Sequence, residues 1–150
     1  TYTRKVSQMI LSYPEKSIWA SLISTIIIFG VYFTMAFKVI NDPTIPDITL
    51  IFFFIGAVGT IIIVQIILQS ILAIINRKAA DAGHDERDKA IGMRSTQYAY
   101  YILIFGIWAS VAAMLLNFST VLLINLIMLS FIVAEVVSYV GTLIIYRRGS

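Results

Sequence analysis

Long runs of uncharged, apolar residues are the dominant pattern in this chain of 150 residues. The 21 residues between Lys16 and Lys38 would form a helix of about 31 Å, which matches a hydrocarbon core of about 30 Å. Two more such runs follow, and the later one, over 95–134, is too long for one span and is divided by a polar cluster at 117–120. The pattern predicts four spans, over 17–40, 49–76, 97–116 and 120–146.

Composition supports an all-α membrane protein built as a four-transmembrane-helix bundle. The chain is 59% hydrophobic and 13% charged, whereas soluble domains are roughly 45–50% apolar and 25% charged. We expect one membrane domain, covering 1–150. The absence of cysteine excludes thiolate-ligated metals, and the single histidine, His84, excludes bis-histidine haem ligation by one protomer. No cofactor is therefore expected.

The basic residues predict how the helices are oriented. Ten of the eleven lie in the N-terminal segment, in the loop 77–96 and in the C-terminal tail. The positive-inside rule places all three segments in the cytoplasm. The positions of the basic residues thus attribute the net charge of +3 to membrane orientation and not to nucleic-acid binding. We expect the protein to lie in a lipid bilayer and to have no nucleic-acid partner.

The segment 3–13 has an amphipathic pattern of its own. Val6, Met9, Ile10 and Tyr13 recur at i, i+3, i+4 and i+7, with basic residues nearby. This spacing predicts a short interfacial helix lying on the inner leaflet. The alternative is a frayed terminus.

The two halves of the chain resemble each other. A shift of 76 residues aligns Gly30 with Gly106 within similar apolar sequences, and a shift of 70 aligns Gln65 with Glu135. A duplication would give two parallel repeats of a helical hairpin, related by an axis along the membrane normal. Such a repeat permits a homo-oligomer, most simply a dimer. The alternative is chance similarity between isoleucine-rich spans.

Glu135 is the only ionisable residue in the interior of a predicted span. Intramembrane carboxylates mark ion or substrate pathways, and a raised pKa would let Glu135 exchange a proton for a cation. The structural alternative is a protonated Glu135 that forms a hydrogen bond across the bundle. The polar residues at span depth that belong to this candidate site are Gln65, Gln69, Asn125 and Tyr139.

Small residues recur every four positions on the last span, at Ser130, Ala134, Ser138 and Thr142. Such a stripe lets two helix backbones approach closely. It predicts packing inside the bundle, with a dimer interface as the alternative.

The middle loop contains a charged cluster with a structural explanation. Asp85 can cap a helix whose first turn contains Glu86 and Asp88, where the helix dipole favours anions. The helix could run from there into the third span. Successive positions on a helix diverge by about 100°, so the cluster does not converge on one ion and no metal site is expected.

The same segment carries a family resemblance. Asp85-Glu86-Arg87-Asp88, followed by Ile91, Arg94 and an aromatic run at 98–101, resembles a signature of small prokaryotic multi-spanning membrane proteins known only as a domain of unknown function. The resemblance implies a prokaryotic cytoplasmic membrane and no enzyme. It also favours this segment as an element that docks a protein partner, through Asp85, Glu86, Arg87, Asp88 and Arg94.

Two functions follow from these observations. The first is a non-enzymatic interaction or regulatory protein that uses its cytoplasmic loop-helix to bind a cytoplasmic protein. The second is a small proton-coupled exporter, acting as an oligomer, with Glu135 as the coupling carboxylate. An enzyme is not expected, because the sequence has no Ser-His-Asp set, HExxH motif, P-loop or cysteine pair.

Overall fold

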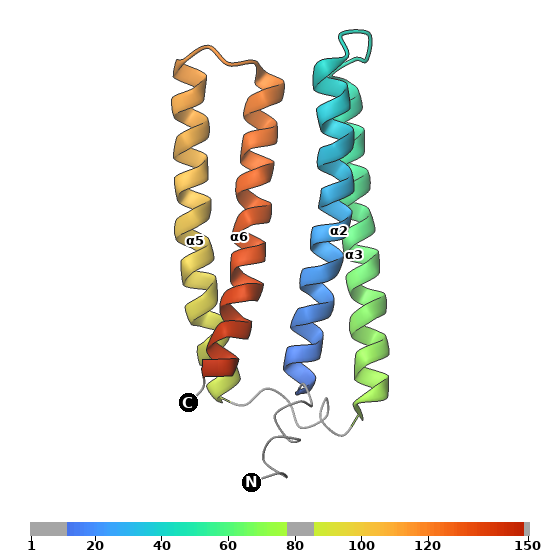
Figure 1. Cartoon of the computed structure of the whole chain (residues 1–150), viewed down its shortest axis with the longest axis vertical. Helices are drawn as coiled ribbons and strands as arrows, with labels where there is room; N and C mark the ends of the chain where they lie inside the picture. Colours follow the sequence, from blue (N-terminus) through green and yellow to red (C-terminus); the bar gives the residue numbers. More distant parts are fainter. Residues whose placement is uncertain (1–11, 78–85, 149–150) are drawn as a thin grey trace.

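The computed structural model describes residues 12–77 and 86–148, which form four long α-helices (Figure 1). This confirms the all-α fold of four helices. Each helix is long and apolar enough to cross a membrane. The expected interfacial helix over 3–13 lies outside the described residues except for its last two positions. The helices are α2 (Tyr13–Asn41), α3 (Ile48–Ile75), α5 (Glu86–Leu115) and α6 (Thr120–Arg148).

Helix α2 begins with a reciprocal cap. The Ser12 N–H donates to Glu15 Oε2 at 2.8 Å, and the Glu15 N–H donates to Ser12 Oγ at 3.4 Å. Two backbone donors that have no partner within the helix are satisfied in this way. Pro14 fits in the first turn because no backbone donor is needed there.

Helix α5 begins well before its apolar part. Glu86 and Asp88 lie in its first turn, as expected for helix initiation at this point. Residues 86–96, which the span boundaries place in the loop, are therefore helical and continuous with the third span. Asp85 lies outside the described residues.

The turn between α5 and α6 has a left-handed residue at its centre. Asn117 adopts a φ of 59°, a conformation that asparagine tolerates better than most residues. The N–H of Phe118 reaches back to the Ala113 carbonyl at 3.3 Å, which is the pattern of a Schellman cap. Ser119 then starts α6, since its Oγ accepts the N–H of Leu122 at 3.3 Å. These bonds explain why the long uncharged run breaks here.

The helices form two antiparallel hairpins, α2 with α3 and α5 with α6 (Figure 1). The hairpins meet mainly through α2 and α6, so the packing order is α3, α2, α6, α5. In a twofold repeat, α2 corresponds to α5 and α3 corresponds to α6. The contact between α2 and α6 would then have a counterpart between α5 and α3. That counterpart is not among the main contacts of the described helices. The repeat stays a prediction from the sequence.

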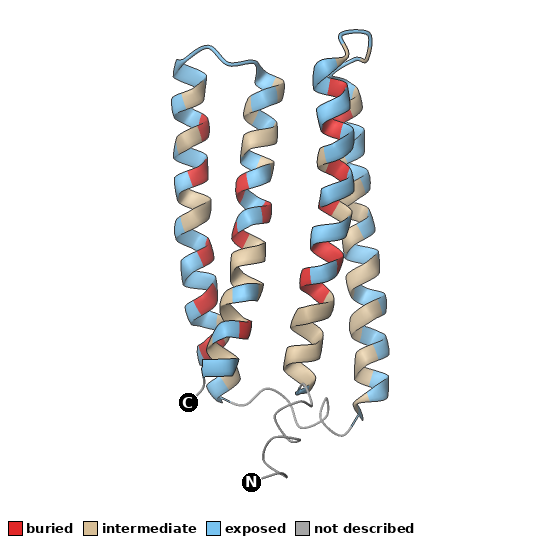
Figure 2. Ribbon diagram, in the orientation of Figure 1, coloured by how far each residue is buried: buried red, intermediate tan, exposed pale blue. Residues whose placement is uncertain are grey.

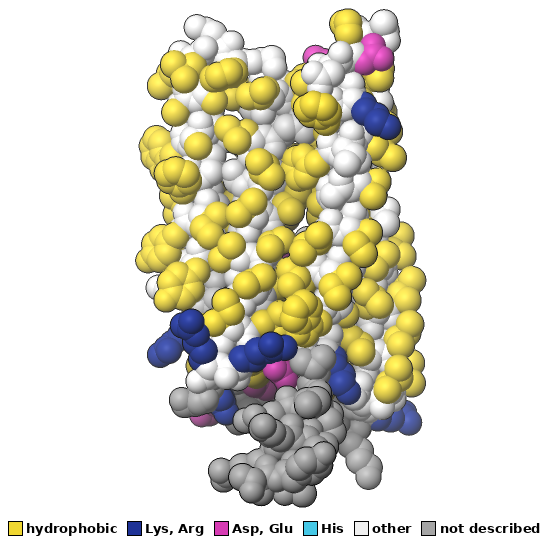
Figure 3. Space-filling model, in the orientation of Figure 1, with side chains coloured by type: hydrophobic (Ala, Val, Ile, Leu, Met, Phe, Trp, Pro, Cys, Tyr) yellow, Lys and Arg dark blue, Asp and Glu magenta, His cyan; other side chains and the backbone are white. Residues whose placement is uncertain are grey.

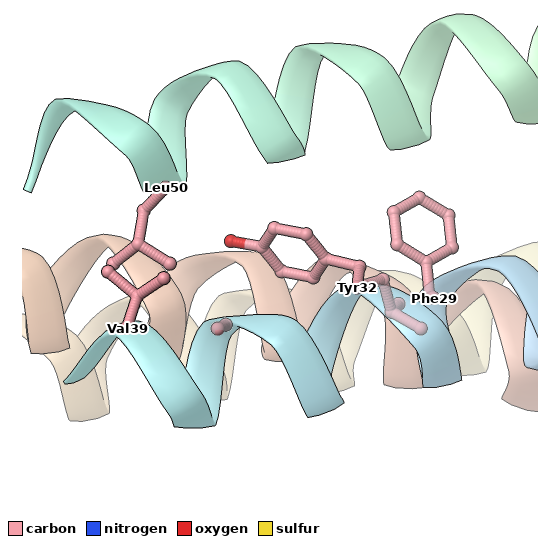
Figure 4. Packing of buried hydrophobic residues seen from close by; sticks show 6 residues of the cluster. Phe29, Tyr32, Val39 and Leu50 are labelled. Carbon is pink, nitrogen blue, oxygen red and sulfur yellow. The ribbon is translucent and has the colours of Figure 1, made fainter. Parts of the chain in front are cut away.

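Buried residues form a narrow core where the hairpins meet. Phe29, Tyr32, Ala36 and Val39 of α2 pack with Leu50 of α3 and Ile132 of α6. Figure 4 shows the side chains of Val39 and Leu50 pointing toward each other. Most large hydrophobic side chains elsewhere are exposed, and Figure 2 shows exposed positions along every helix. Such apolar surface is normal for a protein surrounded by lipid.

Charge is distributed unevenly between the two ends. Figure 3 shows apolar side chains along the height of the visible face, with most of the visible Lys and Arg gathered at the end where α2 begins and α6 ends. The opposite end, which we call the loop end, is made by the connections at 42–47 and 116–119. Its ionisable residues are Lys38, Asp42 and Asp47. The loop end therefore carries a small excess of negative charge.

Helices α5 and α6 approach closely through small residues. A β-carbon at Gly106 of α5 would overlap the side chain of Ser130 on α6, and one at Gly141 of α6 would lie 3.5 Å from Ser95 Oγ. Ser130 and Ala134 are buried, and Ser138 and Thr142 are half-buried. The stripe on α6 thus packs inside the bundle, as the first interpretation of its spacing predicts.

This close approach predicts a position-dependent effect of adding one methyl group. Gly106→Ala should lower the free energy of unfolding by about 1–3 kcal/mol, because Ser130 must move to admit the new carbon. Gly30→Ala is the matched control: nothing lies within 4 Å of a β-carbon there, and alanine gains up to about 1 kcal/mol of helix propensity over glycine. Unfolding in a mixed detergent series measures both. Equal effects of the two variants would contradict the packing described.

Candidate functional site

Polar side chains at span depth form a ladder between α2 and α3. Ser17 Oγ donates to Gln69 Oε1 at 2.7 Å, and Ser21 Oγ donates to Gln65 Oε1 at 2.9 Å. The amide nitrogens complete it: Gln69 Nε2 donates to Ser21 Oγ at 3.1 Å, and Gln65 Nε2 donates to Ser24 Oγ at 3.2 Å. Because water is absent from the bilayer core, polar groups there must find partners within the protein, and this pairing supplies them.

The ladder gives Gln65 and Gln69 a structural role. Both amides lie on one face of α3, four residues apart, and the serines of α2 at i, i+4 and i+7 match that face. The serines were not among the predicted site residues, although their spacing could have indicated them. In the second half of the chain, the positions that align with these three serines after the shift of 76 residues are Met93, Gln97 and Tyr100. The second hairpin therefore has no equivalent ladder.

Glu135 is half-buried near the middle of α6, and its partner is on its own helix. The neighbouring side chain that interacts with Glu135 is Tyr139, one turn further along the same helix. Gln65, Gln69 and Asn125, the partners expected across the bundle, are engaged elsewhere. Glu135 is therefore not held in an interhelical network with those residues.

A side-chain hydrogen bond between α2 and α6 crosses the junction of the two hairpins. Tyr32 Oη of α2 donates to Asn125 Oδ1 of α6 at 3.0 Å. The Asn125 amide nitrogen donates to the Val121 carbonyl at 2.9 Å, which fixes the orientation of the amide. The Tyr32 ring packs edge-on against Phe33 and Phe54, with centroids 5.1 and 5.8 Å away. The sequence pattern indicated Asn125 but not Tyr32, since tyrosines also occur elsewhere in the spans.

The hairpins border a half-open cavity near the loop end. Its volume is about 510 Å³, within the range of about 300–1,000 Å³ typical of small-molecule sites. The walls come mainly from α3 and α6, and Tyr32 and Asn125 also border it. Met128 lies in the cavity wall, and Glu135 follows seven residues later on the same stripe of α6. The walls are Leu50, Ile51, Phe54, Val121, Ile124 and Met128, with Asp47, Ile48 and Thr120 near the helix starts.

The charged segment before the third span is tied to the end of α6. Tyr146 Oη donates to Asp88 Oδ1 at 2.6 Å, so Asp88 joins the first turn of α5 to the last turn of α6. Glu86, Arg87 and Arg94 have exposed side chains, and Arg94 lies beside Gln97 and Tyr100 on the outer surface of α5. Asp88 is half-buried. Of the predicted docking residues that the structure describes, one is therefore an anchor and three are presented at the surface.

Potential metal ligands are dispersed in the part of the chain that the structure describes. No group of three or more His, Cys, Asp or Glu side chains comes together there. The carboxylates lie near the ends of the helices, except for Glu135.

Comparisons with family models, curated proteins and solved structures found no match to this chain. The family resemblance of the segment from Asp85 to the aromatic run stays a prediction.

The serine–glutamine ladder predicts a moderate loss of stability when it is broken. Gln65→Leu should lower the free energy of unfolding by about 0.5–1.5 kcal/mol, the range expected for hydrogen bonds between membrane helices. Ser70→Ala is the control on the same helix, because exposed Ser70 donates only to the Ile66 carbonyl. Its effect should be small. A Gln65→Leu protein as stable as the wild type in the same unfolding assay would show that the ladder contributes nothing.

Proposed function

We propose that the protein is a non-enzymatic membrane protein that binds a cytoplasmic protein through the first turns of α5. The observation that carries this proposal is the hydrogen bond of 2.6 Å between Tyr146 and Asp88. It fastens a charged helical segment to the body of the protein before any partner arrives. Binding then requires no ordering of that segment, which lowers its entropic cost.

Charge distribution supports the choice of this end. The basic residues Lys16, Arg77, Arg147 and Arg148 lie at the start of α2, the end of α3 and the end of α6, at the same end of the bundle as the start of α5 (Figure 1). By the positive-inside rule, that end faces the cytoplasm of a prokaryotic cell, with both termini on the same side. The exposed cations Lys89 and Arg94 favour an acidic surface on the partner.

Site-specific photocrosslinking tests the docking proposal. A photoreactive amino acid at position 89, adjacent to Asp88 and exposed, should capture one discrete cytoplasmic protein. Arg94→Glu should reduce the crosslinked product by at least about tenfold, because like charges placed opposite each other cost several kcal/mol. Lys38→Glu makes the same charge change at the loop end and should have no effect. Equal losses in the two variants, or no discrete product, would refute docking at this segment.

A second function is supported by Glu135. A half-buried carboxyl in the middle of α6, beside Tyr139 and on the same stripe as the cavity wall, has the position required of a proton-coupling residue. The distance along the axis from Met128 to Glu135 is about 10 Å. Exporter activity would need an oligomer, most simply a dimer, because four helices enclose little space.

Glu135→Gln separates the two functions. In proteoliposomes containing a pH-sensitive dye, an exporter should release protons when organic cations are added, and Glu135→Gln should abolish that signal. Under the docking proposal the wild type gives no cation-dependent proton signal, and Glu135→Gln leaves crosslinking from position 89 unchanged. Circular dichroism of the variant confirms that its helices are intact. A proton signal that survives in Glu135→Gln would exclude Glu135 as the coupling group.

A further inference from the structure

The cavity at the loop end has a polar mouth at Asp47 and apolar walls. Asp47 immediately precedes α3 and borders the cavity. Leu50 and Phe54 continue the wall inward, about 10 Å along the axis from Asp47 to Phe54. Tyr32 and Asn125, which a hydrogen bond joins, also border the cavity. A cavity with this order of groups matches a ligand that is charged at one end and apolar at the other.

The charge of the mouth is set by Asp47. Its side chain is exposed and makes no capping hydrogen bond to α3, so the carboxylate remains available. The nearby Asp42 differs, because both the hydroxyl and the N–H of Thr44 donate to its Oδ1 at 2.6 and 3.0 Å. These bonds hold the pKa of Asp42 below its usual value. Asp47 is thus the carboxylate free to meet a ligand at the cavity.

Two helix N-termini also border the mouth and would favour an anion if their donors were free. Several of these donors are occupied. The N–H groups of Thr49 and Leu50 bond to the carbonyls of Pro46 and Asp47, and the N–H of Leu122 bonds to Ser119 Oγ. Each helix start carries at most about half a unit of positive charge. With several of its donors occupied, the pair does not exceed the full negative charge of Asp47.

We infer that this cavity binds an amphipathic monocation, with the cationic head at the Asp47 carboxylate and the apolar part between α3 and α6. An ammonium group carrying an alkyl chain is the simplest member of this class. The lipid hydrocarbon chain is the competing occupant. It would use the same walls but gain nothing from Asp47, and an anionic lipid headgroup would be repelled by it.

The test measures binding of n-decylammonium and its neutral analogue n-decanol to the whole protein in phosphatidylcholine nanodiscs. Partition into empty nanodiscs is subtracted, which leaves the saturable component. The wild type should bind decylammonium more tightly than decanol by about two- to fivefold, as expected for an exposed ion pair. Asp47→Asn should make the two affinities equal.

Asp42→Asn is the matched control, since it removes the same charge from the same end without touching the cavity wall. It should keep the preference for decylammonium. Ile51→Trp, or Ile124→Trp on the opposite wall, should remove the saturable component for both ligands by filling the cavity. Two wall variants are used so that a folding defect in one does not decide the result.

Three results would overturn the inference. Equal binding of decylammonium and decanol to the wild type would indicate a lipid-chain site. An equal effect of Asp42→Asn and Asp47→Asn would indicate general surface charge. Saturable binding that survives both wall variants would place the ligand elsewhere on the protein.

Discussion

Hydrocarbon does not compete for hydrogen bonds, and this constraint governs how the helices of this protein pair. Each polar side chain at span depth must find its partner inside the protein. Within the described residues no buried side-chain nitrogen or oxygen lacks a partner. Two glutamines and three serines satisfy one another between α2 and α3, whereas α5 and α6 pair through small residues that bring their backbones together. The two hairpins thus use different means of association, one polar and one steric.

The junction between the hairpins is narrower than either hairpin. It consists of contacts between α2 and α6, a small apolar core and the hydrogen bond from Tyr32 to Asn125. In a soluble protein such a narrow core would leave too much apolar surface in water. In a bilayer that surface is solvated by lipid, so the interface can be small and still persist. The same narrowness leaves room for a cavity beyond the hydrogen bond.

The sequence was sufficient to predict what depends on local pattern. Uncharged runs located the four helices, and Glu86 and Asp88 indicated where α5 begins, because both signals act within a few residues. The partners of Gln65 and Asn125 could not be predicted, since they depend on helix rotation and packing order. An almost uniformly apolar sequence fixes neither. Gly30 and Gly106 illustrate this: they align in the sequence, yet one faces open space and the other faces Ser130.

The position of the Tyr32–Asn125 bond along α2 has a mechanical consequence. Tyr32 lies nine residues from the end of α2 at Asn41 and nineteen from its start at Tyr13, which gives arms of about 14 and 28 Å at 1.5 Å per residue. A rigid hairpin rocking about this bond acts as an unequal lever. If α2 and α6 moved apart at the loop end, their opposite ends would move toward each other. The movement at those ends would be about twice as large as the movement at the loop end. Such a lever would amplify a small movement at the cavity into a larger one beside the first turn of α5.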